Sequence, residues 1–216
     1  MPEPALTVRQ LPRGRHGLPR ETVVQSQRER ILSAMAEVMA ESGYVKTSVA
    51  MIIKRARVSR ETFYEQFRSK EDCFEAAYER AVELLIAGIE ESTAAQADSP
   101  PPSGAARLDR ILHAYLEGLA VEPAYARLYL VEVYAAGAQA IARRMLMQES
   151  FAALLWEALG AHTEEQRFAC QTLVAAISAL VTARIAADDL DGLRALREPL
   201  VDMVRRGGEL YGSTVS

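Results

Sequence analysis

The sequence predicts an all-α protein of about nine helices, in which a small N-terminal helical domain precedes a larger helical bundle. Apolar residues recur at helical spacing along most of the 216 residues, and no stretch alternates as a half-buried strand would. Hydrophobic residues make up 50% of the chain, which is enough for a substantial core. Three consecutive prolines within residues 92–104 forbid helix there and predict a loop between the two parts.

Charge is distributed unevenly along the chain. Residues 1–70 hold 13 Lys and Arg against 7 Asp and Glu, a net charge of +6, whereas residues 71–216 carry a net charge of −10. A basic N-terminal part joined to an acidic remainder is suited to a protein that contacts the phosphates of a nucleic acid with its N-terminal part only. An incidental drift of surface charge along the chain is the alternative explanation.

The first elements are an arm and a helix. Residues 1–25 are rich in Pro, Gly and Arg and lack periodicity, so we expect a flexible basic arm. Ser26 and Glu29 have the spacing of a capping box, which predicts the start of the first helix, and Gly43 is placed to end it.

Residues 47–70 predict a helix-turn-helix. Thr47 or Ser48 can cap a short helix, a tight connection follows at residues 56–58, and Ser59 can cap a second short helix that ends near Phe67. Ser69 is placed to cap the long helix after it. Two helices too short to be stable alone, joined by a three-residue turn between longer helices, are typical of this motif, whose second helix enters the DNA major groove.

The segment from Gly43 to Phe74, GYVKTSVAMIIKRARVSRETFYEQFRSKEDCF, closely resembles the DNA-binding segment of the TetR family of bacterial transcriptional regulators. The matching residues are Gly43, Tyr44, Thr47, Ser48, Ile52, Ala56, Val58, Ser59, Thr62, Tyr64, Phe67 and Lys70. The resemblance implies a helix-turn-helix DNA-binding domain over 26–70, a connecting helix over 71–91, and a ligand-binding and dimerisation domain over 105–216.

We expect the DNA contacts to come from the two short helices and their ends. Arg60 and Thr62 are placed for bases or adjacent phosphates, while Phe63 either touches a thymine methyl group or packs inward. In regulators that resemble this chain, the positions matching Tyr64 and Lys70 typically hold phosphates. The full set of predicted DNA-binding residues is Thr47, Ser48, Ser59, Arg60, Thr62, Phe63, Tyr64, Gln66 and Lys70.

Two residues depart from the family pattern, and the arm adds a further candidate contact. Glu61 stands where the family usually has a small residue close to the DNA backbone, and Arg57 replaces the glycine that such turns often use. Arg13 and Arg15 flank Gly14 and are candidates for a minor-groove contact. A tail that only aids solubility is the alternative for this arm.

The remaining helices are predicted from the helical spacing of apolar residues and from residues that typically begin or end a helix. Pro123 is placed to open one helix, Gly160 to end another, and Thr163 to cap a helix that runs to about residue 187. A turn follows at 188–192, and Pro199 begins the main part of the last helix. The inward-facing residues expected along these helices are Leu108, Ile111, Leu112, Tyr115, Leu119, Leu128, Val131, Tyr134, Ile141, Met145, Phe151, Leu155 and Leu159.

The resemblance implies a homodimer and a small-molecule effector. The dimer would form through the helices near 163–187 and 198–210, although an ordinary internal core helix is the alternative for the first of these. The most apolar segment, residues 173–187, is too short to span a bilayer, so no membrane partner is expected. Residues that could line an effector pocket, each also explicable as core or surface, are His113, Tyr115, Tyr125, Tyr129, Met145, Met147, Gln148 and Trp156.

The residues do not favour an enzyme. His16, His113 and His162 lack a metal-ligand spacing, no phosphate-binding glycine loop or nucleophile motif is present, and no cofactor or metal is expected. Two distant cysteines fit a reduced cytoplasm. The sequence therefore predicts a cytoplasmic, nucleoid-associated repressor that a small molecule releases from a near-palindromic operator on double-stranded DNA. A helix-turn-helix regulator without a ligand and, more distantly, a helical enzyme or protein-binding module are the alternatives.

Overall fold

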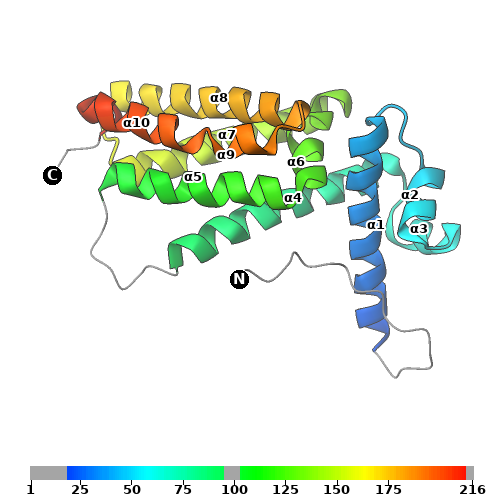
Figure 1. Ribbon diagram of the computed structural model, residues 1–216. Helices are drawn as coiled ribbons and strands as arrows, with labels where there is room; N and C mark the ends of the chain where they lie inside the picture. The colour runs from blue at the N-terminus through cyan, green and yellow to red at the C-terminus, as the bar shows by residue number, and fades with distance from the viewer. Residues whose placement is uncertain (1–18, 95–102, 213–216) are drawn as a thin grey trace. The chain divides into compact units, whose positions relative to one another are not determined.

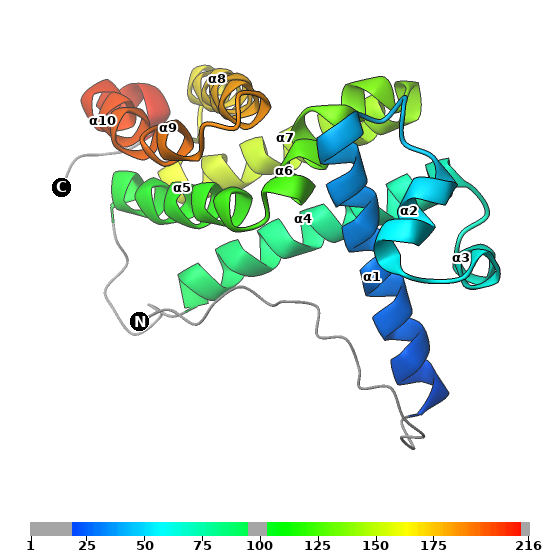
Figure 2. The same cartoon turned by 45° about the vertical axis from the view of Figure 1, so that its right-hand side comes forward.

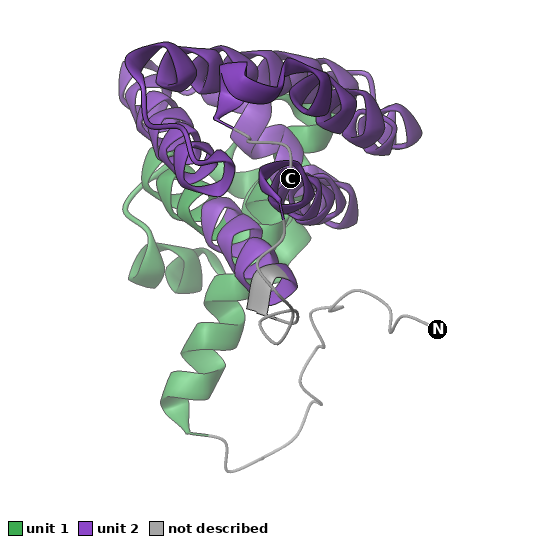
Figure 3. Cartoon of the chain, turned by 90° about the vertical axis from the view of Figure 1, so that its left-hand side faces the viewer, with its two compact units in different colours: residues 1–80 green, residues 81–216 purple. Residues whose placement is uncertain are grey.

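The computed structural model describes residues 19–94 and 103–212, which are almost entirely helical and contain no strand. The chain forms two compact units, residues 1–80 and 81–216, coloured separately in Figure 3. The predicted all-α fold with an N-terminal helix-turn-helix is confirmed.

The helices can be followed along the chain in Figures 1 and 2. Unit 1 contains α1 (Arg20–Ser42), α2 (Val49–Ala56), α3 (Arg60–Gln66) and the start of α4 (Lys70–Ala94). Unit 2 contains the rest of α4, α5 (Gly104–Val121), α6 (Pro123–Leu130), the 3-10 turn η1 (Glu132–Ala135), α7 (Ala138–Leu159), α8 (Glu164–Ala186), α9 (Leu190–Arg194), α10 (Arg197–Gly207) and the 3-10 turn η2 (Gly208–Tyr211).

The first helix starts earlier than the sequence predicted. α1 begins at Arg20, where the Pro19 carbonyl accepts the amides of Thr22 and Val23 at 3.0 and 3.3 Å, so the expected start at Ser26 is wrong. Proline has a backbone angle suited to a helix start, and the Ser26–Glu29 spacing instead lies inside the helix, where residues three apart share a face. Residues 20–25 are therefore helical rather than part of an arm, and Arg13 and Arg15 lie outside the described residues.

Several helix boundaries agree with their predicted signals. Gly43 ends α1 with φ 75°, Pro123 occupies the first turn of α6, and Gly160 ends α7 in the left-handed region at φ 69°. Thr163 and Gln166 form a reciprocal capping box at the start of α8. These positions are determined locally, because each residue satisfies backbone groups that the end of a helix leaves unpaired.

Two boundaries near the C-terminus differ from expectation. The predicted turn at 188–192 contains the start of α9, because the Asp189 carboxylate accepts the Gly192 amide at 2.8 Å and caps that short helix. α10 begins at Arg197 rather than at Pro199, so the proline lies within its first turn, where its missing N–H is tolerated.

The core of unit 2 is formed where α7 and α6 pack against α8, and α10 packs along α5. Most predicted inward residues are buried, but Tyr134 and Met145 are 55% and 59% exposed. Tyr134 turns outward because η1 interrupts the helical phase after Val131. On α7 the buried position is Arg144, one residue before Met145. A charged residue therefore occupies the inward position for which periodicity had indicated a methionine.

Candidate nucleic-acid interface

The helix-turn-helix is built from two capped helices. The Ser48 hydroxyl accepts the Met51 amide at 3.3 Å at the start of α2, and the Ser59 hydroxyl accepts the Thr62 amide at 3.0 Å at the start of α3. The Ser59 and Thr62 hydroxyls also lie 2.8 Å apart. The α3 cap therefore holds Thr62 within the first turn, which is the part of a recognition helix that lies nearest the bases.

The turn between these helices places a non-glycine residue in a left-handed conformation. Arg57 has φ 54° and ψ 46°, in the left-handed region for which such turns often use glycine. A side chain with a Cβ atom raises the energy of this conformation by about 1 kcal/mol.

We expect Arg57→Gly to raise the free energy of unfolding of unit 1 by about 1 kcal/mol, because glycine removes the Cβ clash. Amide hydrogen exchange of the α2 and α3 backbone measures this stability without interference from unit 2. Arg57→Ala is the control, since it removes the charge and keeps the clash. An equal gain in both variants would show that charge, not backbone conformation, is responsible.

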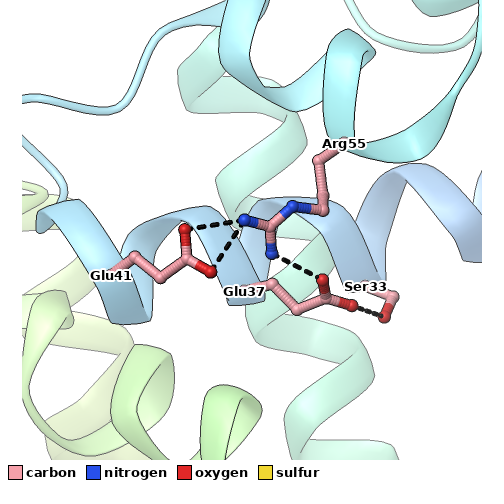
Figure 4. Close-up of polar contacts among 4 residues, drawn as sticks. All are labelled: Ser33, Glu37, Glu41 and Arg55. Atoms are coloured by element: carbon pink, nitrogen blue, oxygen red, sulfur yellow. Dashed lines mark hydrogen bonds and ion pairs between the residues drawn. The ribbon is translucent and has the colours of Figure 1, made fainter.

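Ion pairs and helix-end contacts attach α2 to α1. Arg55 donates to Glu37 at 2.8 Å and to Glu41 at 2.6 and 2.7 Å, and Ser33 donates to Glu37 at 3.0 Å (Figure 4). Arg30 donates to the carbonyls of residues 56 and 57, which satisfies the end of α2. The Arg55 guanidinium is therefore engaged within the unit, although exposed ion pairs of this kind contribute only about 0–1 kcal/mol each.

The faces of α3 divide its residues into core and surface. Phe63 is fully buried and packs against Phe67, with their ring centroids 5.6 Å apart. Of the two alternatives for Phe63, packing inward is therefore correct, and its inclusion among the DNA contacts is corrected. Tyr64 is 44% exposed, and the exposed Arg60 guanidinium lies 5.4 Å from its ring. Arg60 and Tyr64 thus share the outer face of α3.

Two further predicted contacts turn into unit 1. The Thr47 side chain is buried, and its hydroxyl donates to the Gly43 carbonyl at 2.8 Å, so this hydroxyl stabilises the turn before α2 rather than facing outward. Gln66 donates through Nε2 to the Val24 carbonyl of α1 at 3.4 Å, and its Oε1 is buried without a hydrogen-bond partner among the described residues. The structure brings neither side chain to the face shared by Arg60 and Tyr64.

Lys70 is positioned by Tyr44, which was not among the predicted DNA contacts. Its Nζ donates to the Tyr44 carbonyl at 3.1 Å and lies 4.2 Å from the centroid of the Tyr44 ring. Burial, and then the nearby Glu71 carboxylate, raise the pKa of Tyr44, which keeps the ring neutral. Ser69 caps α4 by accepting the Asp72 amide at 3.2 Å, so Lys70 stands at a helix N-terminus, a favourable place for a phosphate.

The helix-turn-helix and the residues beside it carry further exposed charges of both signs. Lys46, Lys54 and Arg68 are exposed cations in or beside the helix-turn-helix, and the sequence reasoning singled out neither Lys46 nor Arg68. Lys46 precedes the start of α2 and Arg68 precedes the start of α4. This position before a helix is the sequence feature by which both could have been recognised as candidate phosphate contacts. Glu61 is exposed in the first turn of α3 beside Arg60, so the predicted carboxylate on the reading helix faces outward.

A second candidate site is a cavity of about 30 Å³ inside unit 2. Of the predicted effector-pocket residues, Tyr115, Tyr129 and Gln148 line it. Met145 is exposed instead, and Trp156, whose indole N–H donates to the Arg167 carbonyl at 3.3 Å, is not part of the lining. His113, Tyr125 and Met147 do not line it either.

The described residues form no group of three His, Cys, Asp or Glu side chains that could hold a metal ion. Cys73 and Cys170 are buried free thiols, and burial raises the pKa of Cys73 to about 12. A thiol with such a pKa stays protonated near neutral pH, so Cys73 is a core residue and not a nucleophile.

Residues 31–77 match the family model of bacterial regulatory proteins of the tetR family. Transcriptional regulators are among the solved structures that share the fold. A TetR-like transcriptional regulator from Rhodococcus sp. RHA1 is 20% identical, with a TM-score of 0.65 over 88% of this chain and 99% of that one. The fatty acid degradation regulator FadR from Bacillus halodurans is 22% identical, with a TM-score of 0.69 over 82% of this chain and 94% of that one. A TerR/AcrR family transcriptional regulator from Aquifex aeolicus VF5 is 24% identical, with a TM-score of 0.59 over 83% of this chain and 98% of that one.

None of the curated proteins matches the sequence closely enough to count as a relative. The matched segment contains α2, α3 and the start of α4, which are the elements that carry Arg60, Tyr64 and Lys70. The N-terminal segment is therefore similar to bacterial regulatory proteins of the tetR family, and the chain as a whole shares the fold of transcriptional regulators that are described as TetR-like.

Proposed function

We propose that this protein is a cytoplasmic homodimeric repressor that leaves its operator when a small molecule enters the cavity of unit 2. The observation that carries this proposal is the double role of α8. One face of α8 supplies Val174, Ile177 and Ser178 to the wall of the cavity. Its opposite face carries Phe168, Ala175 and Ala179 into solvent.

The exposed face of α8 is suited to helix packing between two copies. Phe168 is 70% exposed, and alanines at 175, 179 and 183 continue the same stripe with small side chains that permit close approach. Met203 of α10 adds a further exposed apolar side chain. α8 is also long and apolar enough to cross a membrane by length and composition, and a third of its apolar window is buried within unit 2. A dimer interface accounts for the apolar remainder without a bilayer.

The small size of the cavity explains how ligand binding can change the proposed dimer interface. Its volume of about 30 Å³ has room for only one or two water molecules. Pockets that hold small-molecule ligands measure roughly 300–1,000 Å³. A ligand must therefore displace α5, α7 or α8, and a shift of α8 changes the dimer face on its other side. DNA release follows if the resulting conformer no longer matches the spacing of the two half-sites.

The DNA contacts in this proposal come from residues that face outward or stand at helix ends. α3 enters the major groove, where Arg60 and Thr62 lie nearest the bases, while Tyr64 contacts the adjacent phosphate. Ser48, Ser59 and Lys70 hold the starts of α2, α3 and α4 against the sugar-phosphate backbone. Thr47, Phe63 and Gln66 are not part of this contact surface, since their side chains turn into unit 1.

We expect Lys70→Ala to weaken binding to all duplex sequences and to reduce the salt slope by about one for each half-site, because one phosphate contact is lost. Arg60→Ala should instead relax the preference at one or two base positions, which corresponds to about 1–3 kcal/mol. Fluorescence anisotropy on the preferred duplex and its single-base variants, over a series of salt concentrations, measures both effects.

Arg107→Ala, at an exposed cation of α5, is the matched control and should leave both quantities unchanged. Because Lys70 also packs on Tyr44, hydrogen exchange of α4 must show that the Lys70 variant is folded. If Arg60→Ala weakens every duplex equally, Arg60 contacts phosphate and does not read bases.

The regulatory part of the proposal requires a test in cells. A reporter gene placed behind the preferred duplex should be expressed more strongly when the regulator is removed, and a small molecule that binds unit 2 should have the same effect. Reporter expression that falls on removal would identify an activator. Repression that no bound small molecule relieves would favour the alternative of a regulator without a ligand.

A further inference from the structure

A buried arginine lies in the wall of the cavity. Arg144 of α7 is only 3% exposed. Its guanidinium donates to Ser178 at 2.7 Å, to Thr182 at 3.4 Å, to the Tyr134 hydroxyl at 3.1 Å and to the Tyr129 carbonyl at 3.4 Å. All four acceptors are neutral, so the side chain is hydrogen-bonded but its charge is not compensated.

The buried carboxylate of the element before α7 interacts with another arginine. Glu132, in η1, lies 3.6 Å from Arg127, and Arg144 forms no ion pair with an acidic side chain in residues 19–94 or 103–212. The rings of Tyr129 and Tyr134, with centroids 5.4 and 5.5 Å from the guanidinium carbon, provide only partial compensation. Buried charges are normally paired because desolvation is costly, which makes an unpaired arginine a recognisable anion site.

Further polar groups surround Arg144 on the same wall. The Ser178 hydroxyl accepts from Arg144 and also from Gln148 Nε2, at 2.9 Å. With two donors directed at its oxygen, this hydroxyl keeps its own proton for a further acceptor. Arg144, Gln148 and Ser178 all line the cavity. Together they offer a cation and neutral donors to one small anionic group with two oxygens, such as a carboxylate.

The rest of the lining has the opposite character. It consists of Ile111, Leu112, Tyr115, Tyr129, Phe151, Leu155, Val174 and Ile177, from α5, α6, α7 and α8. A fully ionic ligand would leave these apolar side chains against charge, whereas a wholly apolar ligand would leave Arg144 uncompensated. The polar and the apolar parts of the lining together therefore favour a ligand with one anionic group and an apolar body.

We propose that the effector of this protein is an amphipathic monocarboxylate, with its carboxylate on Arg144 and its apolar body between α5, α7 and α8. The proposal rests on the proposed ligand response and specifies the chemical class of its ligand. Arginine suits this role because its guanidinium stays charged and forms strong, charge-assisted hydrogen bonds to a carboxylate. Entry of the apolar body separates α7 and α8 and enlarges the cavity.

Isothermal titration calorimetry of the full chain without DNA tests this class directly. Octanoate is the probe, with octan-1-ol and octylamine as neutral and cationic compounds of similar size. We expect octanoate to bind more tightly than either comparison compound. Arg144→Met should weaken octanoate binding by roughly 10- to 100-fold, the effect of losing charge-assisted hydrogen bonds, and should leave octan-1-ol unaffected.

Arg107→Met, at an exposed arginine of α5, is the control for a general loss of positive charge and should bind octanoate as the parent protein does. Arg144→Lys keeps the charge without the planar fork and should bind with intermediate affinity. Circular dichroism of each variant establishes that it is folded. Equal binding of octanoate and octan-1-ol, or octanoate binding that Arg144→Met and Arg144→Lys leave unchanged in folded protein, would overturn the proposal.

A parallel measurement of DNA release separates this proposal from the proposed function. If octanoate binds through Arg144 but leaves the DNA complex intact, the ligand class stands and the release mechanism fails. If a neutral or cationic compound releases DNA and octanoate does not bind, the release mechanism stands and the ligand class fails.

Discussion

Ala179→Glu is expected to convert the protein from a dimer to a monomer and to abolish tight binding to a duplex with two half-sites. Residue 179 lies in the middle of the exposed stripe of α8. A carboxylate buried there without a partner would cost about 3–5 kcal/mol for each copy. For the two copies in a dimer this corresponds to a loss of roughly 10,000-fold or more in the dimerisation constant. Sedimentation velocity measures the association state, and anisotropy with the preferred duplex measures DNA binding.

The matched control is Ala142→Glu, the same change at an exposed alanine of α7. It adds the same negative charge to unit 2 but lies outside the proposed interface, so the dimer and DNA binding should remain. A dimeric Ala179→Glu protein that binds the duplex normally would place the interface elsewhere. Its apolar α8 stripe would then need another partner.

The second large effect is expected from substitutions at two adjacent residues of α3, of which one should change stability and the other DNA affinity. Phe63→Ala should lower the stability of unit 1 by about 3–5 kcal/mol, because the ring is fully buried and packs against Phe67. Tyr64→Ala removes a half-exposed ring and should change stability by less than about 1 kcal/mol. It should nevertheless weaken DNA binding, since the phosphate contact of its hydroxyl is lost. Hydrogen exchange of the α3 amides measures the stability of unit 1, and fluorescence anisotropy with the preferred duplex measures the DNA affinity.

These two variants are controls for each other, because they alter adjacent aromatic residues on opposite faces of α3. The expected pattern is unfolding without a specific DNA effect at Phe63, and a DNA effect without unfolding at Tyr64. The reverse pattern would mean that α3 presents its other face to DNA and that Arg60 does not read bases.

Local sequence signals predicted the helix-turn-helix well. Ser48, Ser59, Gly43 and Ser69 act through backbone hydrogen bonds within a few residues, so their positions define the helix ends directly. The left-handed conformation at Arg57 could be inferred because the turn requires it whatever the side chain. The start of α1 was missed because Pro19 and Ser26 both resemble helix starts, and only packing or extension of the helix distinguishes them.

The site residues were harder to assign than the elements that carry them. Phe63 and Tyr64 are both aromatic, and their opposite orientations depend on how α3 packs against α1, which periodicity over a seven-residue helix does not determine. The inward position of Arg144 was also missed, since a charged residue breaks the apolar stripe by which a buried face is recognised. Periodicity therefore overlooks the buried charge on which the ligand proposal depends.

The central claim is that two copies of this chain read a near-palindromic duplex. Selection of binding sequences from a random duplex pool, followed by sedimentation of the selected complex over a series of salt concentrations, tests it most directly. We expect two half-sites about one helical turn apart, roughly 34–36 Å. Two chains should bind each duplex, with affinity falling steeply as salt rises. Selected sequences without two-fold symmetry, a single chain on each duplex, or binding insensitive to salt would contradict the account.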